Sequence, residues 1–377
     1  MAEAYANHVE HWIRQDPKTI ILQPTSYCPM GCTYCYLPGR QDYRHMPPAT
    51  ARAVASAIER ANWPNKTEIV WHGGEPLAAG TDRLNSLLKQ FESLRHAGRI
   101  QHIIQTGATL ITDEWCSLFQ RYGAGVGVSI DGPRFANTHR VNRAGRPMFD
   151  QIVAGAETLR RNGLPFTVLA VITQDTIEHA ENILNFVHDE LGCSWVGLNI
   201  EAQEAANVNG QPPTIDQARR FWRDVFAWSR EHPGKHVREA DRILGFLRLN
   251  EDTRAADAHH DLIPTIGWNG DVVLVSPELL GVRDPHYDDF VAGNVLHDPL
   301  PTILQRAASL RYVQEFAVGL KRCKQSCGFF AYCQGAHAGD RYFEHGSFDA
   351  TETEHCKTSI QAPILALTDL VNEGRET

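Results

Sequence analysis

Six short apolar runs alternate with six longer amphipathic segments over the first 230 residues of the chain. The apolar runs predict β-strands at 19–23, 68–72, 100–106, 125–130, 166–172 and 195–200. The spacing of apolar residues after each run predicts helices at 49–60, 81–94, 112–122, 149–162, 177–191 and 215–230. Serial strand–helix units of this kind favour an α/β fold with a parallel sheet and right-handed crossovers.

Six units suit an open, partial (β/α)6 TIM barrel as well as a doubly wound sheet. In both folds, ligands gather at the carboxyl ends of the strands. After about residue 235 the alternation stops, and the remainder is irregular and rich in Gly, Cys and His, with a short hairpin expected in "GDVVLVSPELLG". We therefore expect a core over residues 1–235 and a second, C-terminal domain over 236–377.

The net charge of −9, without a cluster of Lys and Arg, argues against a nucleic-acid partner. No apolar run approaches the length of a membrane span, and the N-terminal segment lacks the pattern of a signal peptide. The expected location is the cytoplasm, where thiols stay reduced. Nine cysteines in tight clusters then indicate metal ligands rather than disulfides.

The first cluster is "CPMGCTYCY", which places Cys28, Cys32 and Cys35 just after the first predicted strand. Thiolates are soft ligands that suit zinc and iron–sulfur clusters. A structural zinc site needs four closed ligands. Three thiolates on one loop instead leave one iron of a cubane cluster open to a substrate, although a zinc knuckle remains an alternative on spacing alone.

This spacing, with the aromatic residue Tyr34 before the third cysteine, resembles the radical S-adenosylmethionine (SAM) superfamily. The resemblance implies that SAM chelates the open iron of a 4Fe–4S cluster. It also implies that one electron from this cluster cleaves SAM, and that the resulting 5′-deoxyadenosyl radical abstracts hydrogen from a substrate.

The segment "WHGGEP" after the second predicted strand resembles the GGEP motif of that superfamily. The resemblance implies that Gly73, Gly74 and Glu75 bind the amino group of SAM. Paired glycines let the backbone approach a ligand closely, and a carboxylate suits an ammonium group. Arg140 stands where the family often has an arginine for the SAM carboxylate, which a guanidinium can bind with two hydrogen bonds.

Two further strand ends resemble SAM-binding motifs. "IQTGAT" is similar to the family's QTNGT, with Gly107 in place of the asparagine, so that Gln105 and Thr106 remain as a weaker assignment. "VSIDGP" is similar to SIDG, which implies that Ser129 and Asp131 lie near the ribose or carboxylate of SAM.

A second cysteine set stands near the C-terminus, with the spacing C-x3-C-x5-C-x22-C. Four thiolates can close a 4Fe–4S cluster completely, and a four-thiolate zinc site is the alternative. The region resembles SPASM-type extensions, which carry about seven cysteines and two auxiliary clusters. Here the predicted hairpin contains no cysteine, and Ser276 stands near the position where one is expected, so we predict a single auxiliary cluster. Cys116 and Cys193 are expected to be buried structural thiols. The predicted ligands are Cys323, Cys327, Cys333 and Cys356.

The tail "GFFAYCQGAHAGDRYFEHGSFDATETEHC", with "VGLNIEAQEAANVNG", resembles peptide maturases that form cyclophanes in glycine-rich precursors. The resemblance implies a ribosomally made precursor peptide (RiPP) as substrate, an electron donor such as flavodoxin or ferredoxin, and oxidative ring closure. Cyclopropane, thioether and epimer products stay open, as do formylglycine formation on a sulfatase and a non-catalytic electron-transfer protein. Ring closure releases a proton, and the candidate bases are Glu201, Glu204 and His72.

Overall fold

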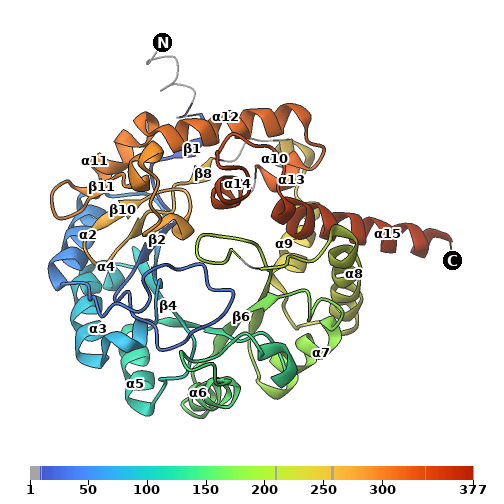
Figure 1. Cartoon of the computed structure of the whole chain (residues 1–377), viewed down its shortest axis with the longest axis horizontal. Coiled ribbons are helices and arrows are strands. Elements are labelled where there is room, and N and C mark those ends of the chain that lie inside the picture. The colour runs from blue at the N-terminus through green and yellow to red at the C-terminus, as the bar shows by residue number, and fades with distance from the viewer. Residues whose placement is uncertain (1–8, 10, 209, 256–258, 336, 377) are drawn as a thin grey trace.

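The structure, a computed structural model, describes the chain except residues 1–8, 10, 209, 256–258, 336 and 377. Six parallel strands pair in chain order and curve into a partial barrel with helices on its outer side (Figure 1). The predicted α/β fold is therefore confirmed, and each strand lies within one residue of its predicted bounds. The strands are β2 (Thr19–Leu22), β3 (Thr67–Trp71), β4 (Ile100–Thr106), β5 (Gly125–Ser129), β6 (Phe166–Ile172) and β7 (Trp195–Ile200).

Helices follow the strands as predicted, with two interruptions. The segment predicted as 81–94 breaks at the 3-10 turn Lys89–Phe91 because Phe91 leaves helical geometry (φ −104°) to pack its ring edge-on against Trp71. The segment predicted as 177–191 ends in a π turn at Phe186–Glu190. The helices are α2 (Pro48–Ala61), α3 (Thr81–Leu88), α4 (Glu92–His96), α5 (Asp113–Tyr122), α6 (Phe149–Arg161), α7 (Ala180–Asn185) and α8 (Ile215–Glu231).

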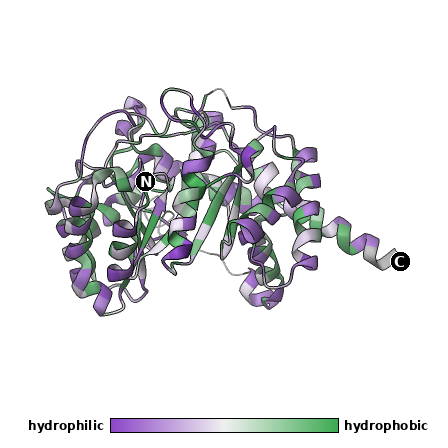
Figure 2. Cartoon of the chain, turned by 90° about the horizontal axis from the view of Figure 1, so that it is seen from below, coloured by the Kyte–Doolittle hydropathy of each residue, from purple (hydrophilic) through white to green (hydrophobic). Residues whose placement is uncertain are grey.

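Local sequence explains several helix ends. Thr214 caps α8 in a reciprocal capping box with Gln217. Thr112 occupies the N-cap position of α5 without a side-chain hydrogen bond. The strands are the most hydrophobic part of the fold, whereas the outer helices turn polar residues to solvent (Figure 2). Buried strands covered by helices are the expected state of a parallel sheet.

The C-terminal part joins the same sheet. The hairpin was predicted within "GDVVLVSPELLG" (270–281), but it forms earlier in the chain: β9 (Thr265–Ile266) pairs antiparallel with β10 (Asp271–Val273), and the segment after β10 forms the 3-10 turn Pro277–Leu279 instead of a second strand. β9 also pairs parallel with β2. β11 (Gly293–Asn294) pairs with β10 at the edge. The boundary predicted at residue 235 thus lies between segments that share one sheet, and it remains a prediction. The other elements are β1 (Ile13–Arg14), β8 (His260–Asp261), α9 (Arg238–Arg248), α10 (Glu251–Ala255), α11 (Leu300–Gln305), α12 (Arg311–Ser326), α13 (Phe330–Cys333), α14 (Ala338–His345) and α15 (Ala362–Glu376).

The last helix, α15, returns to the core and packs along α8 (Figure 1). Arg219 and Arg223 on α8 form paired ion contacts with Asp369 and Glu373 on α15. None of the helices built from described residues is long and apolar enough to span a membrane.

Candidate active site

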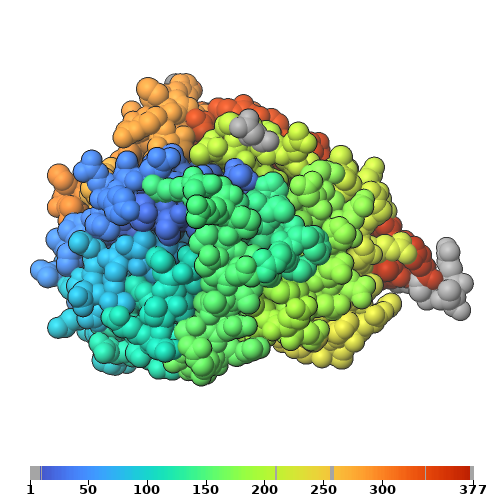
Figure 3. Space-filling view, turned by 60° about the horizontal axis from the view of Figure 1, so that its bottom comes forward, coloured from blue at the N-terminus to red at the C-terminus, as the bar shows by residue number. Residues whose placement is uncertain are grey.

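The three N-terminal cysteines lie on the loop between β2 and α2, at the carboxyl end of the first core strand. Arginine side chains fix this loop through its carbonyls: Arg143 Nη2 donates to the Cys28 oxygen (2.9 Å), and Arg40 Nη1 donates to the Cys32 oxygen (3.0 Å). The Gly31 amide donates to the Val141 oxygen (2.7 Å), so the loop adjoins the segment after β5, as the blue and green surfaces show (Figure 3). These hydrogen bonds fix the backbone of the loop, and its three thiols form no disulfides.

The surroundings of Cys28 and Cys32 disfavour free thiolates. Burial raises the pKa of Cys28 to about 12, and the negative charges of Glu75, Cys32 and Cys35 add to this shift. Burial also raises the pKa of Cys32, which is 8% exposed. Three soft donors close enough to repel one another fit a cationic iron–sulfur centre, which compensates their charge.

The GGEP segment packs directly beneath the cysteine loop. Gly73 and Gly74 have φ values of +83° and +105°, and a Cβ on Gly74 would lie 2.4 Å from the Thr25 carbonyl oxygen. The Glu75 amide donates to the Tyr27 oxygen (2.9 Å). The motif therefore requires glycine both for its backbone conformation and for this close approach.

Glu75 is almost fully buried and ties two predicted SAM motifs together. Its carboxylate accepts hydrogen bonds from Thr106 Oγ1 (2.7 Å) and from the amides of Gly107 (2.8 Å) and Leu77 (3.1 Å). Burial raises the pKa of Glu75, and these hydrogen bonds oppose the shift. Its contact with the SAM amino group stays a prediction.

The structure gives a physical reason for Gly107, the departure from the QTNGT pattern. A Cβ at this position would lie 2.7 Å from Met30 Sδ and 3.3 Å from Glu75 Oε2. Met30, between the first two cysteines, occupies the space that a larger side chain would need. Sequence reasoning missed Met30, although the glycine was a detectable sign of close packing.

Asp131, Arg140 and Tyr34 form one buried group. Asp131 accepts hydrogen bonds from Arg140 Nη2 (2.8 Å), Tyr34 Oη (2.5 Å) and the Val171 amide (2.8 Å). The guanidinium lies over the Tyr34 ring, 5.5 Å from its centroid. The residues predicted to contact SAM are thus brought together beside Cys35, but Asp131 and Arg140 use much of their capacity on each other. Their roles at SAM stay predictions.

The last predicted SAM residues, Gln105 and Ser129, lie on adjacent strands. Gln105 Nε2 donates to Ser129 Oγ (2.9 Å) from β4 to β5. Both side chains are half-buried, so they remain available to a ligand in the barrel.

Arg140→Met is expected to lower the free energy of unfolding by about 3–5 kcal/mol, because it leaves the Asp131 carboxylate buried without its charge partner. Chemical denaturation of the purified protein measures this change. Arg134→Met is the matched control, since the Arg134–Asp150 ion pair is exposed and should matter little. Equal effects of the two substitutions would refute the importance of the buried pair.

The four C-terminal cysteines line one small cavity of about 20 Å³. Arg341, 2% exposed, directs Nη2 to Cys323 Sγ (3.5 Å) and to the Gly335 oxygen (2.6 Å). Burial raises the pKa of Cys333 to about 12, with a further contribution from Cys356. Four converging thiols beside a buried guanidinium fit a closed cluster of negative charge. Cys116 and Cys193 are buried in the core, as predicted.

The three candidate bases have different surroundings. Glu201 accepts a hydrogen bond from Asn207 Nδ2 (3.3 Å) in the loop after β7. His72 Nε2 contacts the Tyr36 hydroxyl (3.1 Å), and burial lowers the pKa of His72. Glu204 faces other carboxylates: burial raises its pKa well above the ordinary value, and the charges of Glu278 and Asp340 raise it further.

Glu204 belongs to a group of four polar residues that the sequence did not predict. We call this group the polar cluster, and its members are Glu204, Glu278, His337 and Asp340. His337 contacts Glu278 through Nε2 (3.7 Å) and Asp340 through Nδ1 (3.5 Å). The four residues come from the loop after β7, the segment after β10 and the start of α14. Only the fold brings them together, so no spacing in the sequence pointed to them.

Comparison with known proteins agrees with this geometry. The sequence model described as the radical SAM superfamily matches residues 22–187. An uncharacterized protein of Synechocystis, sll1766, is 32% identical over 357 residues, which cover 91% of this chain and 89% of that protein. The fold and the cysteine loop define a radical SAM enzyme. The chain belongs to the radical SAM superfamily, whose members use a 4Fe–4S cluster and SAM.

The serine-type anaerobic sulfatase-maturating enzyme of Bacteroides thetaiotaomicron is 28% identical over 189 residues, 48% of this chain and 45% of that protein. The match thus spans about half of that relative. Two solved structures share the fold. One is anSMEcpe with AdoMet and the Cp18Cys peptide (TM-score 0.74, 19% identity, 96% of this chain and 100% of that chain). The other is Streptococcus suis SuiB with the precursor peptide SuiA (TM-score 0.66, 18% identity, 94% and 79%).

Proposed function

We propose that this enzyme modifies a ribosomally made precursor peptide and closes a ring in it, as a C–C cyclophane or a cyclopropane. The observation that carries the proposal is the position of the polar cluster between the two cysteine sets. The Ala206 amide, close to Glu204, donates to the oxygen of Tyr36 beside the N-terminal set (3.0 Å). His337 lines the cavity of the C-terminal set. A peptide that reaches the polar cluster therefore lies near both.

The bound cofactors supply a 5′-deoxyadenosyl radical from SAM and an electron acceptor for oxidative closure. Cys28, Cys32 and Cys35 would hold the SAM cluster. The four C-terminal cysteines would hold one auxiliary cluster, and an electron donor such as flavodoxin or ferredoxin would reduce the SAM cluster. The chain itself must position the peptide and accept the proton that closure releases.

We assign the proton acceptor to His72. Burial lowers the pKa of His72, so its imidazole is neutral near pH 7 and can take a proton. Its Nδ1 has no hydrogen-bond partner among the described residues, while Tyr36 holds Nε2. Glu204 is the second candidate, and burial together with the charges of Glu278 and Asp340 raises its pKa.

Formylglycine formation on a sulfatase is the second candidate, because sulfatase-maturating enzymes are among the relatives. Co-expression with candidate precursors encoded nearby, followed by mass spectrometry, tests the two. Ring closure removes two hydrogens and suppresses backbone fragmentation inside the ring. Oxidation of serine to formylglycine also removes two hydrogens, but it creates an aldehyde that reacts with hydroxylamine. An aldehyde-positive product, or an epimer of unchanged mass, would overturn ring closure.

Cys333→Ala is expected to lower the iron content from about eight to about four atoms per chain, because one of two 4Fe–4S clusters loses a ligand. SAM cleavage should persist, while the modified peptide disappears because oxidative closure lacks its electron acceptor. Iron analysis, 5′-deoxyadenosine assay and peptide mass spectrometry measure the three effects. Cys193→Ala, in the buried core, should keep full iron. A content near twelve atoms in the parent protein would refute a single auxiliary cluster.

A further inference from the structure

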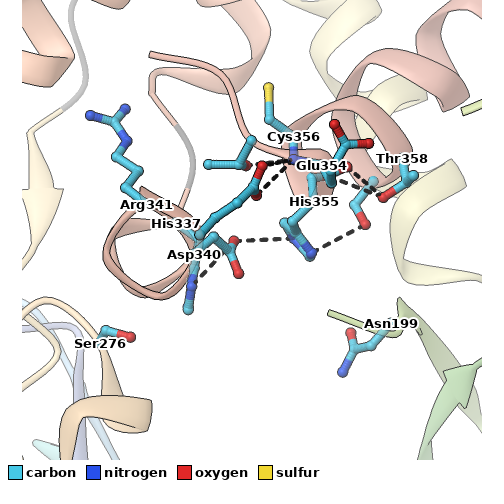
Figure 4. A network of polar contacts seen from close by, with 12 residues as sticks. Asn199, Ser276, His337, Asp340, Arg341, Glu354, His355, Cys356 and Thr358 are labelled. Carbon is cyan, nitrogen blue, oxygen red and sulfur yellow. Dashed lines mark hydrogen bonds and ion pairs between the residues drawn. The ribbon is translucent and has the colours of Figure 1, made fainter. Parts of the chain in front are cut away.

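The polar cluster gathers three carboxylates and an imidazole in one place. Glu204, His337 and Asp340 each offer one ligand atom, and these three atoms lie within 4.8 Å of one another. The adjacent cation Arg341 directs Nη2 of its guanidinium to Cys323 and to the Gly335 carbonyl rather than to these carboxylates. Figure 4 shows Arg341 directed away from the Asp340 carboxylate.

Asp340 supplies an independent observation that the group takes a ligand. The residue is 4% exposed, yet among the described residues its carboxylate oxygens have no hydrogen-bond partner other than the carboxyl group of Glu204. Its closest imidazole partners are His337 Nδ1 at 3.5 Å and His355 Nε2 at 3.7 Å, and Asp340 stands between them (Figure 4). These separations are longer than charge-assisted hydrogen bonds, which measure about 2.7–2.9 Å.

His337 is oriented as a metal ligand would be. Its Nε2 faces Glu278 at 3.7 Å, and Ser276 donates a short hydrogen bond to the same Glu278 carboxylate. In metal sites a carboxylate commonly faces one ring nitrogen of a histidine in this outer-sphere position and leaves the other nitrogen to the ion. Here that other nitrogen is Nδ1, which faces Asp340.

We propose that Glu204, His337 and Asp340 bind one divalent first-row cation, with Glu278 as the outer carboxylate that orients His337. Ligands of such an ion lie about 2.0–2.2 Å from it, and hence about 3–3.5 Å from one another. The 3.5 Å between His337 Nδ1 and Asp340 Oδ2 matches that spacing, and a carboxylate oxygen of Glu204 lies within 4.8 Å of both ligand atoms.

Imidazole and carboxylate donors suit manganese, zinc or ferrous iron, in contrast to the soft thiolates on either side. Three protein donors leave coordination positions for water or for an oxygen atom of the substrate. The second of these roles rests on the proposed peptide substrate, whereas ion binding itself does not. A measurement of ion binding without peptide therefore tests the metal site independently of the proposed peptide substrate.

Mn²⁺ is the probe, because it prefers these donors over thiolates. The full-length, cluster-loaded enzyme is titrated with Mn²⁺ without SAM or peptide, and free Mn²⁺ is counted by electron paramagnetic resonance. We expect one bound ion per chain, affinity at least tenfold lower in Asp340→Asn and Glu204→Gln, and histidine nitrogen coupling that disappears in His337→Gln. Asp298→Asn, an exposed carboxylate paired with Arg306, is the matched control and should bind as the parent does.

Glu278→Gln keeps the test decisive if a ligand variant fails to fold. Loss of an outer carboxylate typically costs about 10- to 100-fold in metal affinity, so this variant should bind Mn²⁺ more weakly while its iron content stays unchanged. The proposal is overturned if the parent binds no stoichiometric Mn²⁺, or if Glu278→Gln and the ligand variants bind it as Asp298→Asn does. It is equally overturned if cluster loading abolishes binding, since the ion then occupied thiolates.

Discussion

Cys32→Ala is expected to abolish formation of 5′-deoxyadenosine from SAM and to lower the iron content from about eight to about four atoms per chain. One thiolate of three is lost, and two donors are too few to hold a cubane cluster. The fold of the loop should survive, because Arg40 and Arg143 hold it through backbone carbonyls rather than through the thiols. Anaerobic reconstitution with SAM and dithionite, followed by chromatography of the nucleoside, gives the result.

The control for this experiment is Cys116→Ala. Cys116 is fully buried in α5 and distant in sequence from both cysteine sets, so its loss removes a core thiol and no ligand. This variant should keep its iron and its 5′-deoxyadenosine yield. Persistent SAM cleavage in Cys32→Ala would show that the loop does not carry the SAM cluster. Loss of iron in both variants would instead point to general instability.

The barrel could be predicted because its determinants are local. Each strand appears in the sequence as a short run of apolar residues that become buried, and each helix appears as apolar residues spaced along one helical face. Where prediction erred, a tertiary contact prevailed over local spacing: Phe91 interrupts a helix in order to pack on Trp71. A hairpin was expected at residues 270–281, whereas the structure forms it at 265–273. Its parallel pairing with β2 was not expected, because pairing partners far apart in the chain leave no periodic trace.

The residues of the site differ in the same way: those set by local motifs could be predicted, and those brought together by distant segments could not. Cysteine spacing and glycine motifs sit within single loops, so the sequence alone pointed to Cys28 and to Gly74. The pairing of Asp131 with Arg140 was not foreseen, because each residue was interpreted by its own motif. Asp340 and His337 stood within a quoted segment without a role, since their partner Glu204 lies more than a hundred residues away. Loops that are distant in sequence converge only in the folded protein, so this group of residues becomes visible only in the three-dimensional structure.

Gly74→Ala is expected to lower the free energy of unfolding by more than the ~1–3 kcal/mol that left-handed backbone strain alone costs. The added Cβ would lie 2.4 Å from the Thr25 oxygen and 3.0 Å from the Tyr27 oxygen, and backbone atoms cannot swing aside as a flexible side chain can. SAM affinity should fall by more than about tenfold, which is about 1.4 kcal/mol, because the motif shifts with the clash. Chemical denaturation and equilibrium dialysis with SAM measure the two effects.

Gly80→Ala separates strain from contact. Gly80 has a similar positive φ of +86°, but a Cβ there meets no atom within 4 Å, so only the strain should be observed. Equal losses in the two variants would refute a role for close packing at Gly74. The iron content should also differ between the two variants. The carbonyl groups that the added Cβ of Gly74→Ala would meet belong to the segment that continues into Cys28. Displacement of that segment should therefore reduce loading of the N-terminal cluster in Gly74→Ala, whereas Gly80→Ala keeps the iron content of the parent protein.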